Sequence, residues 1–148
     1  MPPAVLTNVK GERKVKEIGE LNLPDSVRYA ETHEWARLEG DIVKVGITDY
    51  GQDNLGDITF VELPQLGESF EKGEQFGTVE STKAVSELFV PVGGEVSAVN
   101  ADLVDSPGLI NSDAYGAGWI IEIKPDRPED VESLMNSSAY REMLEGLE

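Results

Sequence analysis

The sequence contains no cysteine, so the polypeptide itself can supply no thiol nucleophile, disulfide, zinc knuckle, Cys-ligated iron–sulfur cluster or CxxC redox pair. It contains a single histidine, His33, which excludes two-histidine metal sites and allows at most one Ser/His/Asp triad. Redox chemistry in this protein would therefore have to come from an attached group. These absences alone disfavour most classes of enzyme.

Basic residues are also scarce, since 12 Lys and Arg stand against 29 Asp and Glu, for a net charge of −17. Such a chain repels phosphate backbones, so nucleic acid is a poor partner and proteins with basic docking faces are better ones. No apolar run approaches the roughly 20 residues of a membrane span. The first residues also lack the charged start and apolar core of a signal peptide. We expect a cytoplasmic protein with neither a nucleic-acid nor a membrane partner.

The hydrophobic residues, 39% of the chain, are sufficient for one domain with a core, and their pattern predicts a mainly β protein. From Pro24 onward, short runs of alternating apolar residues are opened by a glycine followed by an acid, which is typical of short antiparallel strands. One hairpin is predicted from residues 35–38 and 42–47. Another strand is predicted over residues 119–123, after a long loop at residues 105–118.

A helix is predicted over residues 49–55, capped by Asp49 and ended by Gly56. Three acids, Asp49, Asp53 and Asp57, recur here at four-residue intervals. Because this spacing does not match a calcium-binding loop, we expect helix capping and solvation from them, and no metal site.

The two ends of the chain differ in character from its middle. Residues 1–20 are polar and lack a clear period, which favours a solvated tail or a short appended helix. Residues 21–148 are predicted to form a single domain that closes with helices from about residue 129 to residue 147. A break with a new N-cap is expected at residues 136–138.

The most informative stretch is residues 76–100, in which two predicted strands meet at a tip that contains Lys83. Thr82 and Ala84 leave little bulk around its amine. On composition alone, an exposed lysine at such a tip is usually a solubility charge or a guard against edge-to-edge aggregation. The sequence on either side of Lys83 indicates a more specific role for this lysine.

The segments at residues 80–84 (Glu-Ser-Thr-Lys-Ala) and 91–96 (Pro-Val-Gly-Gly-Glu-Val) resemble the lipoylation hairpin of lipoyl carriers, whose tip lysine is acylated with lipoic acid. Biotin carriers share this fold but place methionines beside the lysine, where Thr82 and Ala84 stand here. The lipoyl domains of 2-oxo-acid dehydrogenases have a similar hairpin without the blocks that surround it in this chain.

Four further blocks, in the same order, resemble the H protein of the glycine cleavage system, and with the hairpin they cover roughly residues 24–145. They are Tyr29–Trp35, Val45–Asp57, Pro107–Trp119 and the segment around Ala139-Tyr140. The resemblance implies a barrel-sandwich hybrid, in which two small β-sheets enclose a core, with a short internal helix and C-terminal helices.

The resemblance also implies a non-catalytic, monomeric carrier with lipoic acid covalently attached to Lys83, flanked by Glu80, Ser81, Thr82 and Ala84. In the family the lipoyl arm accepts an aminomethyl group from glycine decarboxylase, delivers it to an aminomethyltransferase, and is reoxidised by dihydrolipoyl dehydrogenase. A lipoylating ligase or transferase is a further implied partner. A carrier of this kind agrees with the absence of cysteine, because the attached group supplies the dithiol chemistry.

A cationic and hydrolytically fragile cargo benefits from an acidic cleft that limits access of water. By resemblance, the residues of this arm cleft are Thr32, His33, Glu34 and Glu87. A solvated strand charge is the alternative for Glu34. For His33, a hydrogen-bonded structural role beside the cleft is favoured over a catalytic one.

Four other functions stay open on the sequence, one of which is a relay that hands lipoyl groups to other enzymes. An H-like lipoate-binding protein could carry a sulfur intermediate for a heterodisulfide-reductase-like complex of sulfur oxidation. That alternative is kept because Val85, Ser86 and Ala114 depart from the commonest family pattern, and because the N-terminal extension of about twenty residues is unusual for a bacterial member of the family. A hydrolase built from Glu34, Glu80 or Glu87 with His33 is disfavoured, since no spacing fixes two catalytic carboxylates and no nucleophile motif accompanies them. An unmodified interaction module is the last alternative.

Overall fold

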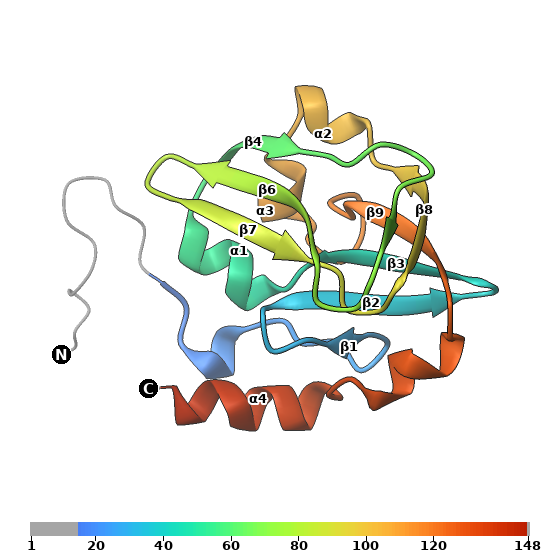
Figure 1. Ribbon diagram of the computed structural model, residues 1–148. Helices are drawn as coiled ribbons and strands as arrows, with labels where there is room; N and C mark the ends of the chain where they lie inside the picture. Colours follow the sequence, from blue (N-terminus) through green and yellow to red (C-terminus); the bar gives the residue numbers. More distant parts are fainter. Residues whose placement is uncertain (1–14, 148) are drawn as a thin grey trace, which may run out of the picture.

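Two antiparallel β-sheets form the body of the computed structural model, which describes residues 15–147 (Figure 1). The six-stranded sheet has the order β1 (Arg28–Tyr29), β2 (Glu34–Glu39), β3 (Ile42–Ile47), β9 (Ile121–Pro125), β8 (Gly94–Val99), β5 (Ser69–Phe70). The three-stranded sheet has the order β4 (Ile58–Glu62), β6 (Gln75–Ser81), β7 (Val85–Phe89). The predicted mainly β fold of two small sheets is confirmed.

The main core lies between the two sheets and takes its side chains from both. Val45 of β3 and Ile121 of β9 are paired neighbours, and both are fully buried, as is Val79 of β6. Alternation along these strands sends every second side chain into this core, because successive residues of a strand point to opposite faces. The core therefore fixes the register of the strands that carry the site.

The β2–β3 hairpin follows the prediction, with Glu39 paired to Ile42 and Gly40 at the turn with φ 63°. Trp35 lies opposite Gly46 in this hairpin and is fully buried. A Cβ atom on Gly46 would lie 2.6 Å from the Trp35 ring, so only glycine leaves room for the indole.

Helix α1 (Asp49–Leu55) has the predicted bounds and ends at Gly56, whose φ is 81°. The predicted cap is wrong by one residue, because Thr48 is the N-cap and its hydroxyl accepts a hydrogen bond from Gly51 N at 3.0 Å. The expected solvation of Asp49 and Asp53 is also wrong, since both are buried. They lie under the segment that precedes residue 21.

That segment contains a short 3₁₀ turn, η2 (Ile18–Glu20), and it is tied to α1 by Lys16. The Lys16 ammonium contacts Asp49 at 2.9 Å, and the backbone N–H of Lys16 donates to Asp53 at 2.7 Å. Most of the predicted N-terminal extension, residues 1–14, lies outside the described residues. The division at residue 20 therefore stays a prediction.

The stretch predicted as a loop contains helical turns, which corrects the sequence analysis. Helix α2 (Asp102–Asp105) ends where the loop was expected to start, and α3 (Leu109–Ser112) lies inside it. Strand β9 starts later than predicted, so Trp119 lies before the strand. The segment before β9 is held instead by a side chain, since the Asn100 amide donates to the carbonyl oxygens of both Ala117 and Trp119.

The C-terminal segment divides as predicted, into a 3₁₀ helix η3 (Pro128–Ser133) and α4 (Ser137–Gly146). Asn136 caps α4 by accepting from Ala139 N at 2.9 Å. Tyr140 of α4 stacks on Tyr29 of β1 with ring centroids 4.6 Å apart. This helix thus closes a second apolar cluster, made with Trp35, Leu144 and other residues. None of the helices in residues 15–147 is long and apolar enough to cross a membrane.

Candidate lipoyl-attachment site and arm cleft

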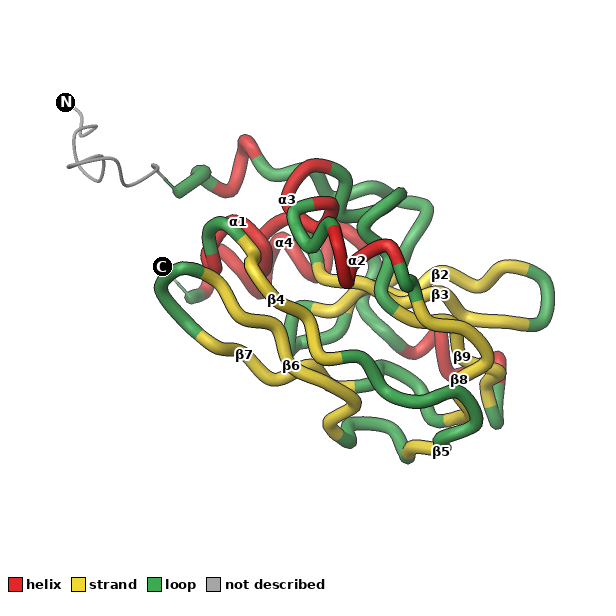
Figure 2. The backbone as a smooth tube through the Cα atoms, turned by 90° about the horizontal axis from the view of Figure 1, so that it is seen from above, coloured by secondary structure: helices red, strands yellow, loops and turns green. Residues whose placement is uncertain are grey.

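Lys83 stands at the tip of the β6–β7 hairpin, which projects beside α1 at one end of the molecule (Figure 2). The backbone of the tip is held in place: Ser81 N donates to Ala84 O at 2.8 Å, and Ser81 Oγ accepts from Lys83 N at 3.2 Å and from Ala84 N at 3.1 Å. Thr82 N also donates to the carbonyl of Asp57 at 3.2 Å. The hairpin therefore presents Lys83 from a fixed backbone.

The side chain of Lys83 is exposed, as are those of Thr82 and Ala84. Its Cε atom passes the end of α1, 3.9 Å from where a Cβ on Gly56 would lie. None of the ion pairs found within residues 15–147 involves Lys83. An amine that is reachable, unpaired in this part of the chain and flanked by small side chains fits the attachment of an acyl group.

A cleft of about 370 Å³ runs along β7, away from the tip. It lies between the loop after β1, the helix α1 and the strand β7. The four residues predicted for the arm cleft all line it, together with residues that were not predicted for it. The lining residues include Thr32, His33, Glu34 and Glu87, with Tyr50, Asn54, Leu55 and Ser86.

Glu34 is only 2% exposed, so the alternative of a solvated strand charge is wrong. Its Oε1 accepts a hydrogen bond from the Thr32 hydroxyl, and its Oε2 accepts from Phe89 N at 3.0 Å. Burial raises the pKa of Glu34 to about 7, against the opposing effect of these two hydrogen bonds. Near neutral pH this carboxyl is thus divided between its acid and its ionised form.

His33 has the left-handed backbone conformation, with φ 77°. Its Nδ1 lies 2.7 Å from the Tyr140 hydroxyl, and its ring packs at a tilt on Tyr50, with centroids 4.7 Å apart. Burial lowers the pKa of this imidazole, which favours the neutral ring. These contacts are those of a hydrogen-bonded histidine beside the cleft.

Glu80 is placed apart from the other acids of the predicted site. It lies on β6, paired with Phe60 of β4 and Val85 of β7, and it is exposed. The structure therefore brings Glu34, Glu87 and His33 to one cleft but leaves Glu80 outside it. Glu80 therefore has no part in this cleft, whose carboxyl groups are those of Glu34 and Glu87.

Comparison with known proteins supports the same reading. A family model described as "Glycine cleavage H-protein" matches residues 27–146. The chain belongs to the glycine cleavage H-protein family. It is 51% identical over 125 residues to the glycine cleavage system H protein of Anaeromyxobacter sp. (strain K), covering 84% of this chain and 98% of that protein. The H protein of Myxococcus xanthus is 49% identical over 124 residues, covering 84% and 96%.

The fold agrees as well. The crystal structure of a glycine cleavage system H protein from Mycobacterium marinum superposes with a TM-score of 0.76 at 40% identity, covering 83% of this chain and 99% of that one. The match to the family model contains Lys83 and the whole cleft but begins after Lys16. The contact between Lys16 and α1 is thus an addition outside the region that the family model describes.

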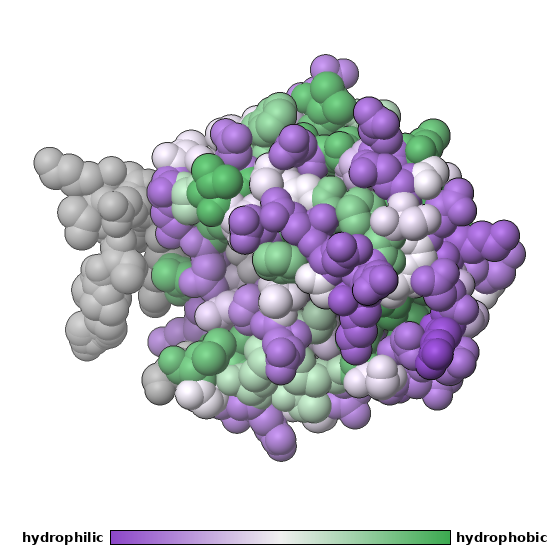
Figure 3. All heavy atoms as spheres, viewed as in Figure 1, coloured by the Kyte–Doolittle hydropathy of each residue, from purple (hydrophilic) through white to green (hydrophobic). Residues whose placement is uncertain are grey.

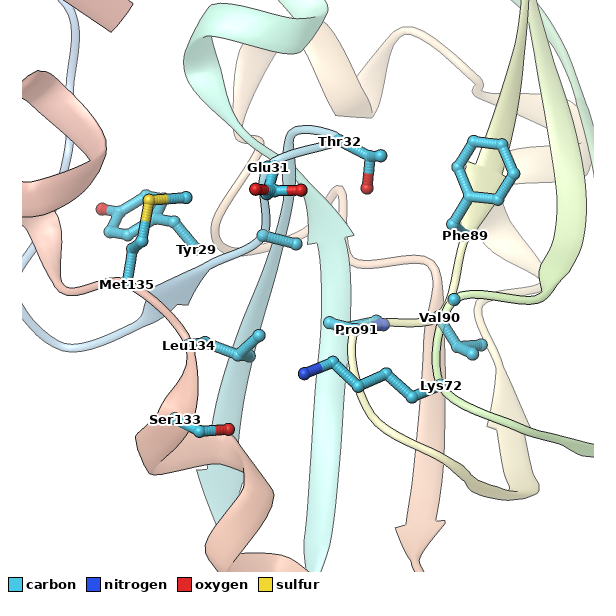
Figure 4. A pocket seen from close by; sticks show the side chains of 12 residues that line it. Tyr29, Glu31, Thr32, Lys72, Phe89, Val90, Pro91, Ser133, Leu134 and Met135 are labelled. Atoms are coloured by element: carbon cyan, nitrogen blue, oxygen red, sulfur yellow. The ribbon is translucent and has the colours of Figure 1, made fainter. Parts of the chain in front are cut away.

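A larger hollow of about 490 Å³ lies beyond the far end of the cleft (Figure 4). It shares Thr32 and Phe89 with a shallower groove that also contains His33 and Glu87, so the hollows adjoin along one face. In Figure 4 the amine of Lys72 points toward the side formed by Ser133 and Leu134. The whole depression is therefore longer than the part lined by the predicted cleft residues.

The most important contacts that sequence reasoning missed are made by Phe89 N and by Tyr140. The first belongs to the backbone, and no side-chain pattern indicates where a strand N–H is directed. Tyr140 lies 107 positions from His33. The sequence marked Tyr140 only as part of a family-like block in a predicted helix, which does not predict a hydrogen bond to the cleft.

Proposed function

We propose that this chain is the lipoyl carrier of a glycine cleavage system, with lipoic acid attached to Lys83. The observation that carries the proposal is the position of Lys83: an exposed amine on a fixed hairpin tip, at one end of a cleft that contains two carboxyl groups. Glu87 lies on β7, four residues beyond Lys83 of the tip, which is at most about 13 Å at ~3.3 Å per residue. A lysine extended by the acyl chain of lipoic acid can span that distance.

When bound, the lipoyl group would supply a disulfide that is reduced as it accepts the aminomethyl group, and the dithiol left after release would be reoxidised by dihydrolipoyl dehydrogenase. The protein's own contribution is to hold Lys83 and to shape the cleft. Ser81, Thr82 and Ala84 keep the tip rigid and small, so the arm alone moves. Attachment to a tether also keeps the cargo at a high local concentration beside the cleft.

Glu34 and Glu87 give the cleft its affinity for a cationic amine. Because the pKa of Glu34 is raised to about 7 by burial, an ammonium group that enters the cleft will favour the ionised form and release a proton from the uncharged fraction. Thr32 and Phe89 N hold the carboxylate in place while this occurs. The protein acts here as a carrier and performs no catalytic step of its own.

The partners that follow from this role are glycine decarboxylase, the aminomethyltransferase, dihydrolipoyl dehydrogenase and a lipoylating enzyme in the cytoplasm. The face shown in Figure 3 is largely hydrophilic, and the net charge of −17 favours partners with basic docking surfaces. The names of the relatives favour glycine cleavage over the sulfur-oxidation alternative.

The test is the intact mass of protein isolated from its native cells without reductant, followed by peptide mapping. We expect the mass increment of a lipoyl group on Lys83, with or without an aminomethyl group. Lys83→Arg should abolish the increment, whereas Lys72→Arg, at an exposed lysine of the same charge, should leave it intact. An unmodified Lys83, in cells whose other lipoyl proteins are modified, overturns the proposal.

A further inference from the structure

A chain of three hydrogen bonds connects α1 and α4 to the histidine of the cleft. Gly51 N donates to Thr48 Oγ1 at 3.0 Å, Thr48 Oγ1 lies 2.9 Å from the Tyr140 hydroxyl, and that hydroxyl lies 2.7 Å from His33 Nδ1. Thr48 and Tyr140 are both fully buried. Water therefore cannot reach these two hydroxyl groups to take the place of their protein hydrogen-bond partners.

The protons in this chain have one order that satisfies every group. A backbone N–H can only donate, so the Thr48 oxygen accepts from Gly51 and keeps its own proton for Tyr140. Tyr140 then donates its proton to His33 Nδ1. The opposite order leaves the buried Thr48 proton without an acceptor among the described residues, at a cost of about 1–3 kcal/mol.

His33 is therefore the acceptor at Nδ1, which requires a neutral ring with its proton on the other nitrogen, Nε2. The lowered pKa of His33, caused by burial, agrees with a neutral ring. Nε2 has no hydrogen-bond partner within residues 15–147, and the ring lines the cleft.

We propose that Tyr140 is a positioning residue that fixes His33 as the Nε2–H tautomer, so that His33 offers the cleft a hydrogen-bond donor. The donor suits an uncharged or anionic acceptor on the arm, such as its amide carbonyl or a thiolate. It does not suit a cationic amine, which is left to Glu34 and Glu87. The cleft is thereby divided into a donor part and an acceptor part.

Tyr140 also holds the backbone at this point. His33 has φ 77°, a conformation that an ordinary side chain rarely adopts. It is retained by three contacts: His33 N to Ala30 O at 3.0 Å, Thr48 N to His33 O at 3.0 Å, and the ring to Tyr140. Because Thr32 and Glu34 flank His33, a change in this backbone would move both polar groups of the cleft.

The single histidine makes the tautomer directly measurable, since every imidazole ¹⁵N signal belongs to His33. Long-range ¹H–¹⁵N spectra of the unmodified protein near neutral pH should show Nδ1 unprotonated and Nε2 protonated. Tyr140→Phe keeps the stacking on Tyr29 but removes the hydroxyl, and we expect a mixture of tautomers. A Nδ1–H ring in the wild-type protein overturns the proposal without any variant.

Tyr29→Phe is the matched control. Its hydroxyl is bonded to Pro24 O at 2.6 Å, and the residue belongs to the same aromatic stack without touching His33 through its oxygen. The His33 spectrum should be unchanged in this variant. An unchanged tautomer in folded Tyr140→Phe would show that Tyr140 does not set it.

A hydrogen bond from His33 Nε2–H to the lipoyl arm rests on the proposed function, and a separate measurement tests it. In protein whose Lys83 is shown by mass to be lipoylated, the His33 Nε2 and Hε2 signals should shift relative to unmodified protein, in either the oxidised or the reduced state of the arm. Unshifted signals in both states overturn the donor role, while leaving the tautomer and the carrier function standing. An unmodified Lys83 in native cells would instead contradict the carrier function.

Discussion

Phe89 N donates a hydrogen bond of 3.0 Å to the Glu34 carboxylate, which joins β7 of one sheet to β2 of the other beside the cleft. The contact makes Glu34 part of the structure that orients the hairpin as well as a group that lines the cleft. It also explains how a carboxyl that is 2% exposed is tolerated, because both of its oxygens have donors. Under the proposed function, stability and cargo binding are therefore coupled through this one side chain.

Glu34→Gln should change how stability depends on pH. The pKa of Glu34 is about 7 in the folded protein against 4.5 as the ordinary value, so the folded state holds the proton more tightly. The contribution of this group to stability is fully present below pH 4.5 and is lost as pH rises to about 7. Glutamine does not titrate, so the variant should gain up to about 3 kcal/mol relative to wild type between about pH 5 and pH 8.

Urea unfolding of Glu34→Gln and wild type at about pH 5 and about pH 8 measures this difference in the free energy of unfolding. Glu95→Gln, at an exposed position of β8, is the control and should track wild type at both. A gap between Glu34→Gln and wild type that stays constant with pH would show that Glu34 does not titrate in this range.

Removal of either cleft carboxylate should shorten the time for which the aminomethyl group is retained. Glu87 is exposed, and the loss of its pairing with a cation should accelerate release about threefold. Glu34 is buried, so Glu34→Gln should accelerate it by about tenfold or more. The measurement is the loss of the aminomethyl mass increment with time from the lipoylated protein, with Glu95→Gln for comparison; equal rates in all forms would contradict an electrostatic role.

Much of the fold was predictable because its signals are local. The β2–β3 hairpin was marked by Gly40, the helix α1 by its cap region and Gly56, and the break before α4 by Asn136. The cap at Thr48 was missed by one residue because threonine and aspartate both cap helices, and only geometry distinguishes them. Turn and cap chemistry thus placed these elements within a residue or two, whereas α2 and α3 were not predicted.

The site was predictable in its side chains but not in its contacts. Resemblance named Thr32, His33, Glu34 and Glu87, and the structure places all four around one cleft. The donor from Phe89 and the bond from Tyr140 depend on how distant segments pack, which no local pattern encodes. The same reason explains the buried state of Asp49, whose partners come from a segment that precedes the first sheet.

Gly46→Ala should destabilise the protein through the β2–β3 hairpin. The added methyl would lie 2.6 Å from the ring of Trp35, which is fully buried and donates to Ala114 O at 3.0 Å. Since the indole cannot move without losing this bond, we expect a loss of about 1–3 kcal/mol in the free energy of unfolding. Gly108→Ala, where no atom lies within 4 Å of the new methyl, should leave stability unchanged or slightly raised.

Lys16→Met should loosen the N-terminal segment from α1. Burial opposes ionisation of Asp49, but hydrogen bonds from Asn22 N, Lys16 and Gln52 outweigh it and lower the pKa of Asp49. Because Lys16 is 38% exposed, solvent screens the pair, and we expect a loss of about 1 kcal/mol that shrinks with added salt. Lys124→Met on β9 is the control, and a loss that does not vary with salt would argue against an ionic contact.

Docking of the lipoylated protein to the aminomethyltransferase should slow as salt is raised. The net charge of −17 steers a basic partner from a distance, and screening shortens that range to about 8–10 Å near physiological ionic strength. We expect the association rate to fall about tenfold between low and physiological salt, with a smaller change in the dissociation rate. A nonelectrolyte such as sucrose at equal osmolality should not reproduce the effect.

The position of the steering charge can be tested with two further variants. Glu80 lies on the hairpin that carries Lys83, whereas Glu129 lies in η3 at the opposite end of the molecule (Figure 1). Since each variant removes one negative charge, a difference between them reports location rather than net charge. Glu80→Gln should slow association more than Glu129→Gln, and equal rates would mean that the partner is attracted by the protein as a whole and not toward the lysine tip.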